Sequence, residues 1–414
     1  MTGIAPLDAM RAGLADAAGE TVGIAVSGGG DSVAALVLAV DVLGASCVAA
    51  VTVDHGLRPG SRDEAEGVAA LCGDLGVSHE ILRWDGPTGG NLQDAARRAR
   101  LRLIGDWASR HGVRRIVLGH TLDDQAETVL MRLARGSGVD GLSAMRPRRM
   151  QGGALWLRPL LGVTRAALRD VLRARGVGWV EDPSNADPRF LRVRAREALQ
   201  ALAPLGIDAA GLAATAMHMQ RAREALEGQT QDALDRFVQA RDGVLRIAPE
   251  ARALPGEIRD RLFAHLVQQI GGSPYRPRID ALQAWVARGE GPLGGCLLAR
   301  SATVLGREAR AVAQLRAAVD QPWDGRWRSV GPVLPGVEIG AMGEGGLHQL
   351  AQQARAGMHP HPRALGLPRA LLCALPGIWQ GERLIAAPLA FWPQGWRLDA
   401  RPLAAIGEDS ALSD

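Results

Sequence analysis

The chain has 414 residues, of which 47% are hydrophobic and 22% charged, a balance typical of a globular protein. Because this length exceeds what one ordinary core supports, we expect two or three domains. All 48 basic residues are arginines, since the sequence contains no lysine, and they exceed the acidic residues by four. This composition excludes any mechanism that requires an enzyme lysine, such as a Schiff base, and only weakly favours a nucleic-acid partner.

Neither a membrane span nor a secretion signal is evident. No apolar run is long enough to cross a bilayer, and the first ten residues lack the basic-then-apolar pattern of a signal peptide. The cysteines are scattered without a Cys-x-x-Cys pair, so we expect reduced, buried side chains and neither disulfides nor a metal site. These features predict a cytoplasmic protein. The cysteines are Cys47, Cys72, Cys296 and Cys373.

A glycine-rich loop lies between the first predicted strand and the helix that follows it. Residues 22–26 are apolar and β-branched, which predicts a buried strand, and residues 33–40 predict a helix. The glycines can adopt positive φ and leave no Cβ in the way of an anion, so backbone N–H groups and the positive helix end would converge on a phosphate. The acidic side chain fits there if it holds Mg²⁺. The loop consists of Ser27, Gly28, Gly29, Gly30, Asp31 and Ser32.

A tight glycine turn without a ligand is the alternative for this loop. Three glycines alone would fit it equally well, but serines at both ends and an acid at the helix start favour the phosphate site. The P-loop of kinases and GTPases is excluded, because no Gly-Lys-Ser/Thr follows the glycines. The sequence therefore predicts a phosphate-binding loop of another kind.

Strands and helices continue to alternate after the loop. This alternation, with apolar strands, predicts an α/β class with a Rossmann-like parallel sheet covered on both faces and ligands at the carboxyl ends of the strands. An Ala-rich stretch before residue 20 predicts a short helix that leads into the sheet. The later predicted strands are residues 46–53, 79–84 and 115–118, and the helices are residues 62–75, 91–111 and 122–135.

Polar residues follow two of these strands. Asp54 and His55 come directly after the second strand, where an aspartate-capped turn is one interpretation and a nucleotide contact the other. His120 follows the fourth strand and precedes a helix whose first turn carries Asp124 and Glu127 on one face. These carboxylates could cap the helix, but beside a triphosphate Asp124 is better placed to hold Mg²⁺, which would polarise the α-phosphate.

Arginines recur at positions suited to phosphate contacts. Arg97 and Arg100 lie on one face of a predicted helix, where guanidinium groups suit phosphate oxygens. Arg135 ends the next predicted helix before a glycine stop. A solvated basic face is the alternative interpretation for the first pair.

A rigid turn and an arginine-rich helix follow near residue 190. Asp182 begins the turn, and Asn185 can hydrogen-bond the edge of a base. In a helix, Arg192, Arg194 and Arg196 fan around the axis and cannot all contact one phosphate. We expect some of these arginines to form structural ion pairs.

The second half of the chain changes character. Residues 205–315 show mainly helical periodicity, which predicts a helical domain. From residue 320 the chain is rich in Gly, Pro and Trp, which predicts a small, mostly β C-terminal module with a loop at residues 341–362. The tryptophans could stack bases, but core positions are the favoured interpretation. The predicted domains are thus residues 1–204, 205–315 and 320–414.

The glycine-rich loop resembles the PP-loop of the N-type ATP pyrophosphatases, which cleave ATP between its α and β phosphates. Over roughly the first 200 residues, the order and spacing of further segments are similar to those of the tRNA(Ile)-lysidine synthetase family. The Asp-Pro-Ser-Asn block at residues 182–185 and the arginine helix after it are the most family-specific part. Val193 departs from the asparagine that many members carry. The similar segments are residues 53–58, 119–127, 135–138, 141–142, 158–161, 179–185 and 190–196.

The resemblance implies ligation of free lysine to C2 of the wobble cytidine in a tRNA(Ile) with a CAU anticodon. ATP would adenylate the base, and lysine would displace AMP to give lysidine. The loop, Asp54 and His120 would contact ATP, while Asp31 and Asp124 would hold Mg²⁺. A base must take a proton from the lysine ε-amine, whose free pKa is about 10.4. His55, His120 and Glu127 are the candidates for this base.

The resemblance also implies that the tRNA contacts come from the arginines and the Asp-Pro-Ser-Asn block, and that the accessory domains hold tRNA. Related enzymes are often homodimers. Two alternatives remain: another PP-loop tRNA-modifying enzyme, such as a 2-thiolase, and a non-catalytic, nucleotide-gated RNA-binding protein. A thiolase would usually need paired cysteines, and the acidic residues around the predicted phosphate site argue against a binding protein. The implied tRNA contacts are Arg97, Arg100, Arg135, Asp182, Asn185, Arg192, Arg194 and Arg196.

Overall fold

The computed structural model describes residues 4–56, 60–84, 86, 92–181, 187, 189–273, 275–332 and 334–407, with residues 92–94 described for the backbone only. Residue contacts divide the chain into two compact units, of which the first ends at Arg223 and the second begins at Glu224. Each unit has its own sheets and its own hydrophobic cores. The predicted boundaries at residues 204, 315 and 320 stay predictions.

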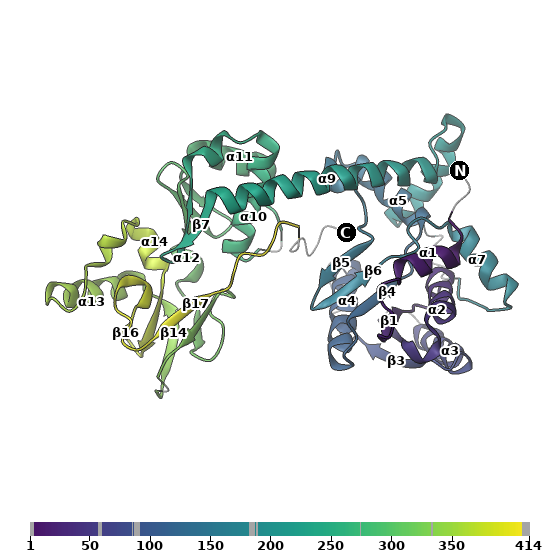
Figure 1. Cartoon of the computed structure of the whole chain (residues 1–414), viewed down its shortest axis with the longest axis horizontal. Helices are drawn as coiled ribbons and strands as arrows, with labels where there is room; N and C mark the ends of the chain where they lie inside the picture. Colours follow the sequence, from purple (N-terminus) through teal and green to yellow (C-terminus); the bar gives the residue numbers. More distant parts are fainter. Residues whose placement is uncertain are drawn as a thin grey trace. The chain divides into compact units, whose positions relative to one another are not determined.

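The first unit is built on a six-stranded sheet with the strand order β3-β2-β1-β4-β6-β5 (Figure 1). Its strands pair in parallel except for the edge strand β5, which runs antiparallel to β6. The chain turns to opposite sides of β1 to form β2 and β4, and ligands of doubly wound sheets bind at such a switch point. The strands are β1 (Val22–Ala25), β2 (Val48–Asp54), β3 (Ser78–Arg83), β4 (Arg115–Leu118), β5 (Arg148–Gln151) and β6 (Ala154–Leu157).

Helices cover both faces of this sheet, and the residues of β1 alternate between the two cores. Val22 and Ile24 pack with α1, α2, α3 and α7, whereas Ala25 packs in the core that contains Trp107 of α4. A Cβ at Gly23 would lie 2.9 Å from the Trp107 ring, so glycine allows α4 to pack closely. The helices are α1 (Pro6–Gly13), α2 (Gly30–Leu43), α3 (Ser61–Asp74), α4 (Leu92–Arg110), α5 (Leu122–Leu133), α6 (Val139–Leu142), α7 (Arg165–Ala174), α8 (Leu191–Leu202) and α9 (Ala209–Phe237), which continues into the second unit.

The second unit contains three antiparallel sheets, with the strand orders β7-β8-β11-β10-β9, β12-β14-β15-β16 and β13-β17. Helices α10 and α11 pack on the first of these sheets, where Phe263, Trp285 and Leu305 are fully buried. The strands are β7 (Val238–Arg241), β8 (Val244–Ile247), β9 (Gly291–Leu293), β10 (Cys296–Ala299), β11 (Val304–Arg307), β12 (Arg316–Ala318), β13 (Trp327–Val330), β14 (Val337–Ala341), β15 (Pro376–Gln380), β16 (Arg383–Ala386) and β17 (Arg397–Ala400). The helices are α10 (Gly256–Gly271), α11 (Ile279–Arg288), α12 (Ala309–Val312), α13 (Gly343–Arg355) and α14 (Arg369–Ala374).

The predicted fold class is confirmed, with a Rossmann-like sheet, a helical region and C-terminal strands. The region at 205–315 contains the expected long helices and also a five-stranded sheet that the sequence did not predict, because its strands have only three or four residues each. The loop predicted at 341–362 is wrong, since α13 forms there and buries Leu347 and Leu350. The favoured core positions are confirmed for Trp323, Trp327, Trp379 and Trp396, which are all buried.

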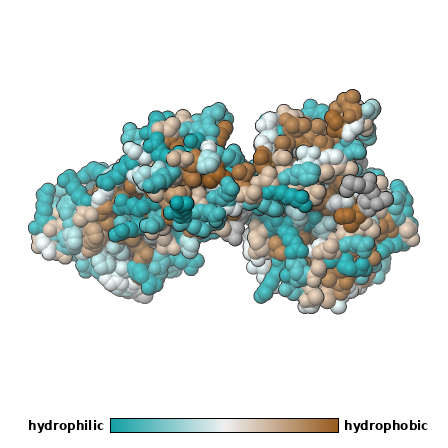
Figure 2. All heavy atoms as spheres, turned by 45° about the horizontal axis from the view of Figure 1, so that its top comes forward, coloured by the Kyte–Doolittle hydropathy of each residue, from teal (hydrophilic) through white to brown (hydrophobic). Residues whose placement is uncertain are grey.

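No single helix in the described part of the chain is long and apolar enough to span a membrane. A bent pair, Leu191–Leu205 with Ala209–Phe237, meets the criteria of length and composition only. Figure 2 shows hydrophilic side chains distributed among apolar ones over the face that it presents.

Candidate active site

The glycine-rich loop turns between the end of β1 and the start of α2. Gly28 has a φ of +84°, a left-handed conformation that favours glycine. The Ser32 hydroxyl donates to the Gly29 carbonyl at 2.9 Å and accepts the Ser27 N–H at 3.1 Å, which closes the loop. Helix α2 then begins at Gly30, and no described side chain caps it. Its first N–H groups and its positive end therefore suit an anion.

Two neighbouring segments hold the loop in place. A Cβ at Gly119, directly after β4, would lie 2.7 Å from the carbonyl oxygen of Asp31, so these backbones approach only because residue 119 is glycine. On another side, the Val180 N–H donates to the Gly28 carbonyl at 2.9 Å. The segment before the Asp-Pro-Ser-Asn block is thus bound directly to the loop.

Asp124, in the first turn of α5, caps this helix with one carboxylate oxygen and contacts an arginine with the other. Asp124 Oδ2 accepts hydrogen bonds from the N–H and the hydroxyl of Thr121 at 2.8 and 2.9 Å, which is the capping arrangement considered from the sequence. Its other oxygen, Oδ1, accepts from Arg165 at 3.1 Å. Burial raises the pKa of Asp124, but neighbouring His120 and two nearby guanidinium groups outweigh this effect and lower it. Asp124 is therefore ionised at neutral pH.

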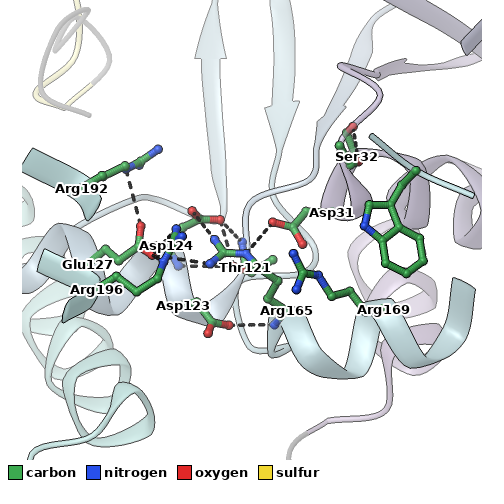
Figure 3. A network of polar contacts seen from close by, with 12 residues as sticks. Asp31, Ser32, Thr121, Asp123, Asp124, Glu127, Arg165, Arg169, Arg192 and Arg196 are labelled. Atoms are coloured by element: carbon green, nitrogen blue, oxygen red, sulfur yellow. Dashed lines mark hydrogen bonds and ion pairs between the residues drawn. The ribbon is translucent and has the colours of Figure 1, made fainter. Parts of the chain in front are cut away.

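Arg165, at the start of α7, joins three of the acidic side chains (Figure 3). Its Nε donates to Asp31 Oδ2 at 3.0 Å, and its Nη1 lies 3.5 Å from Glu127 Oε1. With the bond to Asp124, one guanidinium contacts all three predicted catalytic carboxylates. Burial disfavours its charge, but the carboxylates raise the pKa of Arg165. Sequence reasoning missed Arg165, although it follows a strand of the sheet by only eight residues.

Glu127 is the most buried of these carboxylates, with 1% of its side chain exposed. Arg196 of α8 contacts Glu127 Oε1 at 2.9 Å, and Arg192 lies 3.8 Å from Oε2 (Figure 3). Arg192 and Arg196 are one turn apart and share a helix face, while Arg194 is exposed. The expectation that some of these arginines form structural ion pairs is met by Arg192 and Arg196.

His120 is held as a neutral side chain. Arg158, directly after β6, donates from Nε to His120 Nδ1 at 3.2 Å. Burial, with help from the Arg158 charge, lowers the pKa of His120 to about 3. The remaining ring nitrogen, Nε2, then carries the proton and is a hydrogen-bond donor. His120 is therefore suited to donate to an anion and is a weak base.

Asp54 and His55 lie at the end of β2. Asp54 Oδ1 accepts from the Gly56 N–H at 2.9 Å and from the Ser61 hydroxyl at 2.8 Å, so it organises the turn, and these bonds lower its pKa despite some burial. His55 packs edge-on against Trp84, with ring centroids 5.8 Å apart. Its buried Nδ1 has no hydrogen-bond partner within the described residues. Burial first, and then the Arg100 charge, lower the pKa of His55.

The remaining predicted residues divide into three groups. Arg100 is partly buried in α4, and its charge affects the pKa of both His55 and His120, so it faces the site. Arg97 and Arg135 are exposed. Asp182 and Asn185 lie outside the described residues.

The acidic side chains fit a magnesium ion only together with substrate oxygens. No group of three or more His, Cys, Asp or Glu side chains in the described ranges could hold a metal by itself. The buried Asp31 Oδ1 has no hydrogen-bond partner among these residues, so its lone pairs are available to a cation. Mg²⁺ typically uses one or two carboxylates and completes its shell with phosphates and water. Asp31, with Asp124 beside the same guanidinium, meets this requirement.

The sheet, the loop and the residues at the strand ends together define a PP-loop ATP-binding domain, and residues 8–202 match the PP-loop domain family. The chain belongs to the tRNA(Ile)-lysidine synthase family. The protein of that name from Ruegeria pomeroyi is 48% identical over 391 residues, which cover 91% of this chain and 90% of the relative. The relatives of the same name from Methylobacterium nodulans and Rhodopseudomonas palustris are each 43% identical and match 64% of this chain and 80% of their own length.

A solved structure gives a weaker match. The U34-tRNA thiolase NcsA from Methanococcus maripaludis aligns with a TM-score of 0.45 and 16% sequence identity, over 53% of this chain and 78% of that chain.

Proposed function

We propose that this protein uses ATP to attach free lysine to C2 of the wobble cytidine in a tRNA(Ile) with a CAU anticodon, giving lysidine, AMP and pyrophosphate. The family membership supports the overall reaction. The observation that carries the proposal is the continuous polar network from Asp31 of the PP-loop through Arg165 to Glu127. In this network one guanidinium group joins the phosphate-binding loop to the buried Glu127.

The first step is adenylation of the cytidine. The PP-loop holds the phosphates with its N–H groups and the start of α2, and the His120 Nε2–H donates to the nucleotide. The cytidine O2 attacks the α-phosphorus in line, and the bond to the pyrophosphate oxygen breaks. A magnesium ion held by Asp31 and Asp124 would offset the charge that develops on the leaving group.

The second step transfers lysine to the activated base. The lysine ε-nitrogen attacks C2, the C2–O bond breaks and AMP leaves, while the amine proton passes to a base on the protein. Among the three candidates, His120 has a pKa of about 3 and its Nδ1 is occupied by Arg158. Glu127 is enclosed by guanidinium groups. His55, with a buried Nδ1 that lacks a partner among the described residues, is the base in this proposal.

The arginines that bind the tRNA are those that lie outside the network around Glu127 and the histidines. Arg97, Arg135 and Arg194 are exposed on the first unit and suit the phosphate backbone. Arg100, Arg192 and Arg196 instead act inside the site, since they influence the histidines or contact Glu127. A cytoplasmic location and a homodimeric state complete the proposal.

Radiolabelled lysine, ATP, Mg²⁺ and total bacterial tRNA provide the test. We expect lysine in the tRNA, lost in Asp31→Ala and without ATP. Cleavage of ATP to AMP and pyrophosphate without lysine incorporation would instead indicate another PP-loop tRNA-modifying enzyme. Binding of ATP and tRNA with no release of pyrophosphate would identify a nucleotide-gated RNA-binding protein.

A further inference from the structure

A cavity of about 640 Å³ lies in the second unit, and residues of that unit line it. The turn between β7 and β8 forms one wall, the C-terminal end of α10 a second, and the β13–β17 ribbon a third. This volume is within the range of small-molecule and cofactor sites. The reaction proposed above assigns no role to it.

Positive charge predominates around the cavity. Three arginines and two aspartates line it, and each aspartate already binds two guanidinium groups. Asp242 lies 3.2 Å from Arg246 and 3.6 Å from Arg241. Because its charge is shared in this way, Asp242 leaves its arginines incompletely neutralised.

The second aspartate, Asp324, also shares its charge between two guanidinium groups. Asp324 is 5% exposed and lies 3.0 Å from Arg307 and 3.6 Å from Arg326. Arg401, which also lines the cavity, forms no ion pair with any residue that the structure describes. Five guanidinium groups thus surround two carboxylates, and an anionic ligand would complete the neutralisation.

The walls combine buried donors with apolar surface. Trp327 is 5% exposed, lines the cavity and has an indole N–H without an acceptor in the described ranges. Leu245, Ile270 and Leu398 add apolar wall. An unpaired buried N–H is costly unless a ligand accepts from it. The cavity therefore suits a molecule with an anionic group at one end and a flat, partly apolar ring that carries hydrogen-bond acceptors.

We propose that this cavity binds a nucleoside monophosphate group, with the phosphate at Arg326 and Arg401 and the base against the apolar wall beside Trp327. The group comes either from free AMP, a product of the reaction, or from an unpaired nucleotide at an RNA end. A base is flat and carries ring nitrogens that accept hydrogen bonds, and its phosphate matches a guanidinium fork. Inorganic phosphate would leave the apolar wall uncovered.

Photolabelling of the full-length protein with 8-azido-AMP, followed by peptide mass spectrometry, tests this proposal. Because the labelled peptides are identified by mass spectrometry, nucleotide bound in this cavity is distinguished from nucleotide bound at the PP-loop. We expect labelled peptides that contain residues 240–245 or 398–403. Competition by AMP alone would assign the site to the free nucleotide, and competition by a single-stranded RNA hexamer at lower concentration would assign it to an RNA end. No label in these peptides, or equal competition by inorganic phosphate, would overturn the proposal.

A pair of arginine variants, one in β17 and one directly after it, provides the control. Arg401→Ala removes a cavity guanidinium and should weaken labelling by about tenfold, the usual effect of losing one charged hydrogen bond. Arg397→Ala removes an exposed arginine of β17 that pairs with Asp399 outside the cavity, and should leave labelling unchanged. Equal labelling of both variants and the wild type would also contradict the proposal. Lysine incorporation does not enter this test, so its result is independent of the proposed function.

Discussion

Arg165 connects the acidic residues of the site more directly than any residue singled out from the sequence. Its guanidinium lies within 3.5 Å of oxygens from Asp31, Asp124 and Glu127. Without a cation among them, three nearby carboxylates repel one another, and burial makes their charge still less favourable. Arg165 thus lets these three carboxylates lie close together.

Replacement of Arg165 by methionine should therefore destabilise the first unit and abolish lysine incorporation. We expect a loss of about 3 kcal/mol in the free energy of unfolding at pH 7, as for other buried ion pairs that lose one partner. The variant raises the pKa values of Asp31 and Asp124, which bind protons as the pH falls, so the deficit should shrink at pH 4. Urea unfolding at both pH values measures this.

The same helix offers a control for this measurement. Arg173 is 61% exposed and pairs with Asp170 one turn away, so Arg173→Met should cost less than about 0.5 kcal/mol. A deficit for Arg165→Met that is equal at pH 7 and pH 4, or no larger than that of the control, would contradict the electrostatic role.

The charge of Arg100 should set the acid limit of activity. Burial and Arg100 both lower the pKa of His55 below 6.5, so the neutral base is present at neutral pH. In Arg100→Met the pKa of His55 rises, and the acid limb of kcat/KM for lysine should move to higher pH. The loss of activity should thus be larger at pH 6 than at pH 8. If the acid limb of kcat/KM does not move in Arg100→Met, or is still present in His55→Gln, His55 is excluded as the base.

At the scale of elements, the site forms where four parallel strands end. Asp31 and His120 come after β1 and β4, and Asp54 is the last residue of β2; the sequence predicted all three positions from these strands. Arg158 follows β6, a strand that was not predicted because it comes after β5 in a hairpin and not after a helix, outside the alternation of strands and helices. Arg165 was missed as well, since it lies eight residues beyond the end of that strand, whereas Arg100, Arg192 and Arg196 were singled out from the arginines of their helices.

The close approach of β4 to the PP-loop predicts that Gly119 tolerates no side chain. Gly119→Ala would place a Cβ 2.7 Å from the Asp31 carbonyl oxygen, and the backbone must shift. We expect a loss of about 1–3 kcal/mol in stability, as for other overpacked sites, and at least tenfold weaker ATP binding.

Gly67 provides the matched control for this substitution. It lies within α3, and no atom comes within 4 Å of a Cβ built there, so Gly67→Ala should stabilise the protein by about 0.5–1 kcal/mol. Calorimetric titration with ATP and urea unfolding of both variants measure the difference. Wild-type ATP affinity in Gly119→Ala would show that the loop does not depend on this contact.

In the second unit, sequence analysis was correct about residues more often than about elements. It favoured core positions for the tryptophans, and four of them are buried. It missed α13 because glycines at 343, 345 and 346 disfavour a helix locally, whereas burial of Leu347 and Leu350 stabilises it. Short antiparallel strands likewise depend on partners that are distant in the sequence.

At the scale of the whole molecule, two units with separate cores should lose their structure separately. Trp285 is fully buried with Phe263 in the core of the second unit. Trp285→Ala should lower the stability of that unit by about 3–5 kcal/mol, the usual cost of such a truncation. Hydrogen exchange resolved by peptide should show faster exchange in α10 and α11 and unchanged exchange in β1 and β4. An equal loss of protection in both units would show that they unfold as one.

In the proposed reaction, ATP cleavage at the PP-loop is coupled to lysine transfer at the adjoining side chains. The most direct test is to measure AMP, pyrophosphate and tRNA-bound lysine in one reaction with purified tRNA(Ile). We predict one AMP and one pyrophosphate for each lysine incorporated, and none of the three in Asp31→Ala. Release of ADP and phosphate, or lysine incorporation without AMP, would contradict this coupling.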